Sequence, residues 1–203
     1  MMREVVIATK NKGKALEFEQ MFQPFQIQVK TLLDLPEFPE IEETGATFEE
    51  NAIIKAESVM KETKAMVMAD DSGLVIDALD GRPGVYSARY AGPEKDDEAN
   101  IQKVLRELEG VPLSKRTARF YCALALAIPG RETITVNGTC EGFITFEKKG
   151  ANGFGYDPIF FVQGYERTMA ELLPNEKNKI SHRAEALAKM RTILEQLERE
   201  RVL

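Results

Sequence analysis

The sequence predicts an α/β protein with a mixed central β-sheet flanked by helices. Apolar strand-like runs and amphipathic helical segments alternate through the first half of the chain, which is typical of strands joined by helices. Two longer strand-like runs follow at residues 117–128 and 133–146, and only the turn sequence PGRE separates them. This pair predicts a hairpin at the centre of the sheet, so we expect both parallel and antiparallel neighbours.

The N-terminal elements follow from the spacing of apolar residues. Residues 4–8 predict a short strand, and 14–22 predict a helix because their apolar residues recur at helical spacing. Residues 27–31 alternate as a second strand. The acidic segment 34–45 contains two prolines, so we expect a loop there.

Three further helices are predicted. Thr47 and Glu50 have the spacing of a capping box ahead of a helix over 48–62. An amphipathic pattern predicts another helix over 97–110, and the chain ends in a helix from about Ser181.

An acidic pair interrupts an apolar stretch in the middle of the chain. The run 66–69 precedes Asp70 and Asp71, and a second apolar run follows at 74–76. Because Asp, Ser and Gly favour turns, we expect two strands, with Ser72 and Gly73 turning between them and the carboxylates fixed at the rim.

Composition excludes several classes of protein. The 203 residues carry a formal net charge of −6, which argues against binding to a nucleic acid polymer. No apolar run approaches the length of a membrane span, and the N-terminus has no secretory pattern, so we expect a cytoplasmic protein. One histidine and two cysteines make a zinc site improbable, and any metal should be bound by oxygen.

Two basic segments suit a highly charged small ligand. The loop TKNKGK (residues 9–14) leaves a strand and enters a helix, so its lysines and backbone N–H groups suit phosphate oxygens. The alternative is a solvated turn. In EKNKISHR (176–183), His182 and Arg183 fall in the first turn of the last helix, where a bound anion would relieve their repulsion by the helix dipole. The alternative is neutralisation by neighbouring glutamates.

An aromatic loop and two acidic pairs complete the candidate site. Phe154 between two glycines offers a face for a nucleobase, although such a loop also suits a core anchor. Glu42 and Glu43 on the acidic loop, with Asp70 and Asp71, supply the oxygen ligands that Mg²⁺ prefers beside phosphates. Cations, metal and a carboxylate that activates water are what hydrolysis of a nucleotide anhydride needs.

Six segments, in order over nearly the whole chain, closely resemble the inosine triphosphatase family of non-canonical purine nucleoside triphosphate pyrophosphatases. The segments are TKNKGK, EETGATFEENAIIKA, ADDSGL, PGVYSARYAG, GFGYDPIF and EKNKISHR. The resemblance implies Mg²⁺-dependent hydrolysis of dITP, ITP and XTP to the monophosphate and pyrophosphate by a homodimer, which removes deaminated purines from the nucleotide pool. We expect one domain over 1–203, with two lobes and the active site in the cleft between them.

The resemblance also implies roles for individual residues. Asp71 is the implied proton acceptor and a metal ligand with Glu42, Glu43 beside it being an alternative, and Asp70 supports Asp71. The implied substrate-binding residues are Thr9, Lys10, Asn11, Lys12, Gly13, Lys14, Ser72, Phe154, Gly155, Tyr156, Asp157, Lys177, His182 and Arg183. Lys10 and Lys12 are particular to this chain.

Selection of the base follows from donors and acceptors. Inosine and xanthosine present a 6-oxo acceptor where adenosine presents a 6-amino donor, so N–H donors from His182, Arg183 or loop amides would favour the former. Two rival functions are a pyrophosphatase of modified pyrimidine nucleotides and a nucleotide sensor without turnover.

Overall fold

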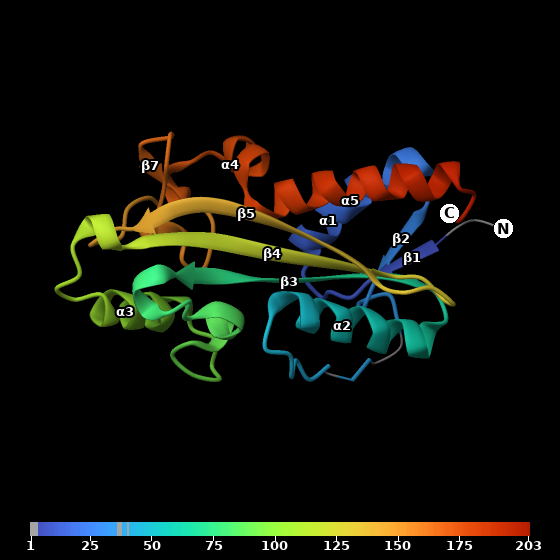
Figure 1. Cartoon of the computed structure of the whole chain (residues 1–203), viewed down its shortest axis with the longest axis horizontal. Helices are drawn as coiled ribbons and strands as arrows, with labels where there is room; N and C mark the ends of the chain where they lie inside the picture. The colour runs from blue at the N-terminus through green and yellow to red at the C-terminus, as the bar shows by residue number, and fades with distance from the viewer. Residues whose placement is uncertain (1–3, 36–37, 40) are drawn as a thin grey trace. The chain divides into compact units, whose positions relative to one another are not determined.

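The computed structural model describes residues 4–35, 38–39 and 41–203, and its centre is a seven-stranded sheet of order β2-β1-β3-β4-β5-β6-β7 (Figure 1). The strands are β1 (Glu4–Ile7), β2 (Gln28–Thr31), β3 (Met66–Ile76), β4 (Thr117–Ala127), β5 (Ile134–Ile144), β6 (Phe160–Val162) and β7 (Arg167–Thr168). The α-helices are α1 (Lys12–Phe22), α2 (Phe48–Thr63), α3 (Asp97–Glu107), α4 (Pro174–Ile180) and α5 (His182–Arg199). The 3₁₀ helices are η1 (Gln23–Phe25), η2 (Asp77–Leu79), η3 (Gly84–Arg89), η4 (Leu113–Lys115), η5 (Asp157–Ile159) and η6 (Met169–Glu171).

The sheet is mixed, as predicted. β1 is parallel to β2 and β3, because α1 and α2 carry the chain back to the same end of the sheet after each strand. β6 is antiparallel to β5 and β7. The expected hairpin is confirmed as β4 and β5, which are the fourth and fifth strands in the order.

The chain divides into two compact units, and it passes from one to the other several times. Unit 1 consists of 1–71, 123–137 and 186–203, and unit 2 consists of 72–122 and 138–185. The strands β3, β4 and β5 contribute residues to both. The single domain over 1–203 and the cleft between two lobes stay predictions.

Unit 1 buries its core on both faces of its strands. Figure 1 shows α2 on one face, with α1 and α5 on the other. Most of the side chains that the helical spacing assigns to the core are buried: Phe18, Met21 and Phe22 of α1, Ala52, Ala56 and Val59 of α2, and Met190, Leu194 and Leu197 of α5. Met60 of α2 and Leu187 of α5, on the same predicted faces, are half-buried. No described helix is both long and apolar enough to cross a lipid bilayer.

Unit 2 has its own apolar core. Ile101, Val104 and Leu108 of α3 and its C-terminal cap pack with Phe120 of β4 and Phe160 of β6 in one buried cluster. Figure 1 shows α3 and α4 on opposite faces of the strands of this unit.

The turn expected at Ser72 and Gly73 is absent from the structure. Residues 66–76 form one continuous strand, β3, and Gly73 is buried within it. β3 lies between β1 and β4, and β4 has the same length of 11 residues. Hydrogen bonding to β4, which is as long as β3, therefore outweighs the local turn preference of Asp, Ser and Gly.

Two helix boundaries also differ from expectation. α1 begins at Lys12, so the end of the TKNKGK segment is already helical. Residues 174–180, which the sequence leaves in a loop, form the short helix α4. Pro174 lies at the start of α4, where its missing N–H and fixed φ are tolerated.

Candidate active site

The acidic pair of unit 1 lies in the middle of a strand. Asp70 and Asp71 are only 4% and 9% exposed, and as neighbours in β3 they project to opposite faces of the sheet. Each carboxylate therefore needs its own partners, because an unpaired charge in a buried position is strongly disfavoured.

The partner of Asp70 comes from the first basic segment. Lys14 Nζ lies 2.7 Å from Asp70 Oδ2, in an ion pair whose carboxylate is almost fully buried. The structure thus brings together two candidate residues that are 56 positions apart in the sequence. Lys14, which the sequence assigns to phosphate binding, and Asp70, which it assigns to supporting Asp71, therefore form one ion pair.

The rest of the TKNKGK segment shapes the start of α1. Thr9 Oγ1 accepts a hydrogen bond from the Asn11 N–H (3.1 Å), and Asn11 Oδ1 accepts one from the Lys14 N–H (3.2 Å). The Lys10 side chain is exposed. Nothing is described of the Lys12 side chain, and the expected roles of Lys12 and Gly13 stay predictions.

Asp71 is held by residues from α2. Asn51 Nδ2 donates to Asp71 Oδ2 (3.1 Å), and Lys55 Nζ lies 3.4 Å from Asp71 Oδ1. Lys55 Nζ also lies 3.2 Å from Glu43 Oε1. Asn51 and Lys55 are four residues apart, so they lie on one face of the helix. One ammonium group therefore holds two carboxylates together.

Burial and charge act on this cluster in opposite directions. Burial raises the pKa of the Asp71 carboxyl, and the neighbouring Lys55 ammonium opposes that shift. Burial alone would lower the pKa of Lys55, but the carboxylates of Asp71, Asp70 and Glu43 together raise it. Lys55 therefore stays charged, and Asp71 has the raised basicity that suits a group that takes a proton from water.

The two glutamates of the acidic loop lie differently. Glu43 contacts Lys55, whereas Glu42, the implied metal ligand, is exposed. Within the described residues, no group of three or more His, Cys, Asp or Glu side chains gathers as a metal-binding cage. Glu43 and Asp71, two carboxylates that already face one cation, do fit Mg²⁺, which usually takes one or two carboxylates and completes its shell with water and phosphate oxygens.

In unit 2, the aromatic loop is ordered by a buried carboxylate. Asp157 is 4% exposed, and its Oδ2 accepts the Phe154 N–H (2.9 Å) and a hydrogen bond from Lys177 Nζ. Lys177 Nζ lies 4.8 Å from the centroid of the Phe154 ring, which is 65% exposed. The core-anchor alternative for Phe154 is therefore wrong, because its ring faces solvent above a cation.

The other residues of this loop are already bonded within the protein. The Gly155 N–H donates to Asp97 Oδ2 (2.8 Å), and the buried Tyr156 donates its hydroxyl to the Ser87 carbonyl (2.8 Å). In this structure Tyr156 and Asp157 hold the loop in place, and Phe154 is its exposed aromatic face.

The second basic segment spans the junction of α4 and α5. Ser181 accepts the Ala184 N–H at the start of α5, as expected of a cap (3.1 Å). The His182 ring stacks on Phe120 with centroids 5.1 Å apart, and Arg183 is 9% exposed. Ser72 of β3 is half-buried in the same unit.

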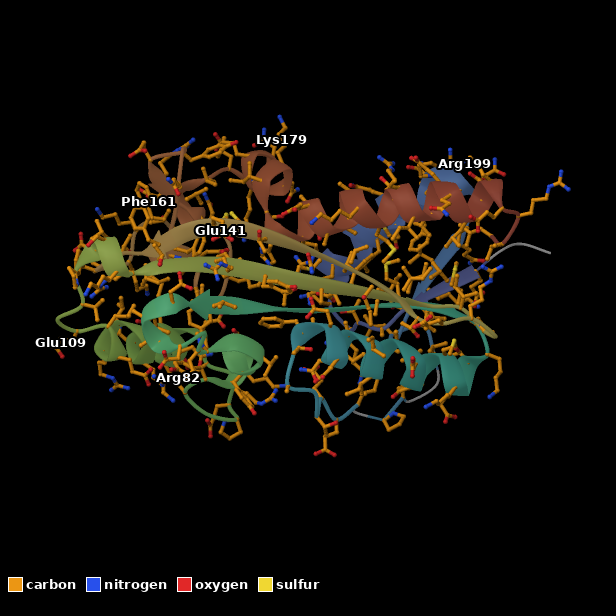
Figure 2. The ribbon with its side chains drawn as sticks, in the orientation of Figure 1. Arg82, Glu109, Glu141, Phe161, Lys179 and Arg199 are labelled. Atoms are coloured by element: carbon orange, nitrogen blue, oxygen red, sulfur yellow. The ribbon has the colours of Figure 1, made fainter. Side chains whose placement is uncertain are left out.

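The two lysines of α4 point in different directions. Lys177 turns inward to Asp157, while Figure 2 shows Lys179 pointing away from the sheet into solvent. Of the glutamates proposed to neutralise this segment, Glu176 pairs with Arg167 (2.9 Å) and Glu185 accepts the Thr139 N–H (2.8 Å).

Comparison with known proteins shows which family the chain belongs to. Residues 5–193 match the Ham1 family, and a dITP/XTP pyrophosphatase of Bacillus licheniformis is 63% identical over 96% of this chain and 100% of its own. The chain belongs to the Ham1 family. The resemblance carried by the six segments is thereby confirmed.

Other Ham1 relatives agree in sequence and in structure. The dITP/XTP pyrophosphatase of Bacillus subtilis is 60% identical over 96% of this chain and 98% of its own. The Ham1 protein of Staphylococcus aureus superimposes with a TM-score of 0.90 at 46% identity, covering 96% of this chain and 99% of its own. A Coxiella burnetii HAM1 protein gives a TM-score of 0.91 at 46% identity, covering 96% of this chain and 100% of its own.

Two residues of the site have no role in the sequence-based assignment. Asn51 and Lys55 lie within the EETGATFEENAIIKA segment, but polar residues on a helix are usually solvated. The sequence signal that could have identified them is their i, i+4 spacing, which places both on one face of a helix. It becomes meaningful only when the Asp71 carboxylate is known to face that side of α2.

Proposed function

We propose that this Ham1 protein is a nucleoside triphosphate pyrophosphatase that hydrolyses dITP, ITP and XTP to the monophosphate and pyrophosphate. Relatives that are 59–63% identical to this chain are dITP/XTP pyrophosphatases, which supports the proposal. Such an enzyme removes deaminated purines from the nucleotide pool, and we propose that it acts as a homodimer in the cytoplasm.

One observation carries the chemical part of the proposal. In unit 1 Lys14 contacts Asp70, and a second lysine, Lys55, bridges Asp71 to Glu43. Cations for phosphate, carboxylates for a metal and a partly desolvated base are thus assembled within one unit. These groups match the needs of phosphoanhydride hydrolysis.

In the proposed reaction Asp71 takes a proton from a water molecule that attacks the α-phosphorus, and pyrophosphate leaves. Lys14 offsets charge on the phosphates. Glu43 and Asp71 are the residues that would hold Mg²⁺, which supplies Lewis-acid stabilisation of the charge that builds up on the phosphate oxygens. The exposed Glu42 remains the alternative to Glu43.

Unit 2 is proposed to bind the rest of the nucleotide. Phe154 offers its exposed face to the base, and Lys177 and Arg183 offer positive charge. The Phe154 and Gly155 amides already donate to Asp157 and Asp97, so they are poor candidates for reading the 6-oxo group. His182 and Arg183 remain the proposed donors. A 6-amino group is itself a donor and cannot pair with them, so binding adenosine would leave one of these donors without a hydrogen bond.

Product analysis tests the proposal. Incubation with ITP and Mg²⁺ should yield IMP and pyrophosphate, whereas IDP and inorganic phosphate as first products would contradict it. Steady-state kinetics across dITP, XTP, dGTP and dATP should show higher kcat/KM for dITP and XTP than for dATP, which carries the 6-amino group. Similar values for all four would refute the proposed selection of the base, and a preference for modified pyrimidines would favour the first rival.

The variant Asp71→Asn separates enzyme from sensor. General-base catalysis contributes about 10²–10⁴-fold, so we expect a loss of kcat in that range with the fold retained by circular dichroism. A nucleotide sensor would have no turnover to lose.

A further inference from the structure

A buried amide connects the acidic loop of unit 1 to Asp71. The side chain of Asn51 lies in the first turn of α2 and is 1% exposed. Its Oδ1 accepts the backbone N–H of Gly45 (2.8 Å), and its Nδ2 donates to Asp71 Oδ2 (3.1 Å). Because burying an unsatisfied amide is costly, both contacts are needed to keep Asn51 in this position.

The chemistry of the two partners fixes the orientation of the amide. A backbone N–H can only donate, and an ionised carboxylate can only accept, so Oδ1 must face Gly45 and Nδ2 must face Asp71. Aspartate at this position would keep the acceptor and lose the donor. Alanine would lose both groups.

Gly45 allows the loop to approach this closely. A Cβ atom at Gly45 would lie 2.7 Å from Asn51 Oδ1 and 2.9 Å from the Asn51 backbone nitrogen, which is closer than van der Waals contact permits. The loop backbone therefore packs directly against the amide. Glu43 lies two residues before Gly45 on the same loop, so the contact also restricts where Glu43 can reach.

The two oxygens of Asp71 have different partners. Oδ1 faces the charged Lys55, and Oδ2 faces the neutral amide of Asn51. The charged Lys55 would compete with any other cation that binds this carboxylate. The neutral Asn51 amide fixes the rotation of the carboxylate without competing with a cation. Geometry of this kind supports a group whose orientation must be exact for proton transfer.

We propose that Asn51 is a positioning residue of the hydrolytic site, which fixes the rotation of the Asp71 carboxylate and ties it to the loop that carries Glu43. The inference rests on the proposed function in one respect, namely that Asp71 is the base. It adds to that function a residue that acts through Asp71 and touches no substrate.

The chain offers a matched control in unit 2. Asn100 of α3 is 2% exposed, its Oδ1 accepts the Ala91 N–H (2.7 Å), and its Nδ2 donates to the Ala88 carbonyl (3.1 Å). Asn100 is therefore a buried helical asparagine with the same two kinds of bond, but it bonds to backbone only. Replacing it should affect folding stability in the same way and leave the base untouched.

The experiment compares Asn51→Ala, Asn51→Asp and Asn100→Ala with the wild-type enzyme. For each, urea unfolding gives stability, kinetics with ITP and Mg²⁺ give kcat and KM, and calorimetry without nucleotide gives the affinity for Mg²⁺. We expect Asn51→Ala and Asn100→Ala to lose similar stability. Of these two alanine variants, only Asn51→Ala should lower kcat, by about 10–100-fold as for a misplaced catalytic group, with KM changed less than about twofold and Mg²⁺ binding weakened.

Asn51→Asp separates the two contacts of the amide. It keeps the shape of the side chain and the acceptor for Gly45, but it replaces the donor to Asp71 by an acceptor, so kcat should fall at least as far as in Asn51→Ala. If Asn51→Ala does not fold, the kcat of Asn51→Asp tests the inference instead. An Asn51 variant that folds and keeps the kcat of Asn100→Ala overturns the inference.

The outcomes also separate this inference from the proposed function. If the wild-type enzyme is active and Asp71→Asn is inactive while the Asn51 variants are unaffected, only the inference fails. If Asp71→Asn keeps full activity, the assignment of the base fails first, and Asn51 then has no base to position.

Discussion

Each oxygen of the Asp71 carboxylate has a separate partner on α2, so this buried acid is held through both of its oxygens. Lys55 provides a positive charge beside Oδ1, and Asn51 provides a directional hydrogen bond to Oδ2. Asp70, on the other face of β3, forms an ion pair with Lys14. Pairs of this kind contribute little net stability because both ions lose hydration, so their value is in placing the groups.

The choice between Glu43 and Glu42 as a metal ligand gives a test at the residue scale. The Glu43 carboxylate lies against the ammonium that also holds Asp71, so we expect Glu43→Gln to raise the Mg²⁺ concentration for half-maximal activity by about tenfold or more, as for loss of a supporting metal contact. Glu42→Gln is the matched control, with an exposed side chain and the same change of charge. A larger effect in Glu42→Gln would restore the assignment that the family resemblance implies.

At the scale of elements, the acidic pair shows where local preference is overruled. Asp, Ser and Gly at 70–73 favour a turn, yet they lie inside β3, because the long neighbouring strand β4 provides partners for backbone hydrogen bonds that a turn would leave open. The helix α2 is the opposite case. Its start at Phe48 and its capping box follow from Thr47 and Glu50 alone, because a cap is a contact between residues three positions apart.

That cap also supports the site, which predicts a coupling between helix stability and activity. Thr47 Oγ1 accepts the Glu50 N–H (3.1 Å), and Glu50 directly precedes Asn51, which contacts Asp71. Thr47→Ala should lower the free energy of unfolding by about 0.5–2 kcal/mol in urea titrations, and it should also lower kcat.

Asp96→Ala is the control for this coupling. Asp96 Oδ1 caps α3 through the Ala99 N–H (2.7 Å), and we expect a similar loss of stability there with kcat unchanged. Equal kcat values in the two cap variants would show that fraying of α2 does not reach Asp71.

At the scale of the whole molecule, the proposed homodimer predicts a simple mass. Analytical ultracentrifugation at micromolar protein should give twice the chain mass of 22.8 kDa. Dilution should lower activity only where it also lowers the dimer fraction. A single-chain mass with full activity would contradict the dimer and leave the proposed chemistry intact, because the Asp70 and Asp71 contacts described above all come from one chain.

Sequence alone was enough for the features that depend on near neighbours or on a long ordered set of motifs. The alternation of strands and helices, the central hairpin, the capped start of α2 and the family of the chain all belong to this class. The sequence also singled out the acidic pair, but it placed the two carboxylates at the end of a strand, whereas they lie in the middle of β3. A single chain read in order has no information about which strands will flank β3.

The tertiary structure decided the contacts between residues that are distant in sequence. It placed Lys14 on Asp70, Glu43 rather than Glu42 beside Lys55, and the amide of Asn51 between Gly45 and Asp71. It also turned Tyr156 and Asp157 inward and left Phe154 exposed. The physical reason is the same in each case: a buried polar group must find its partner in space, and the packing of strands and helices determines which partner is within reach.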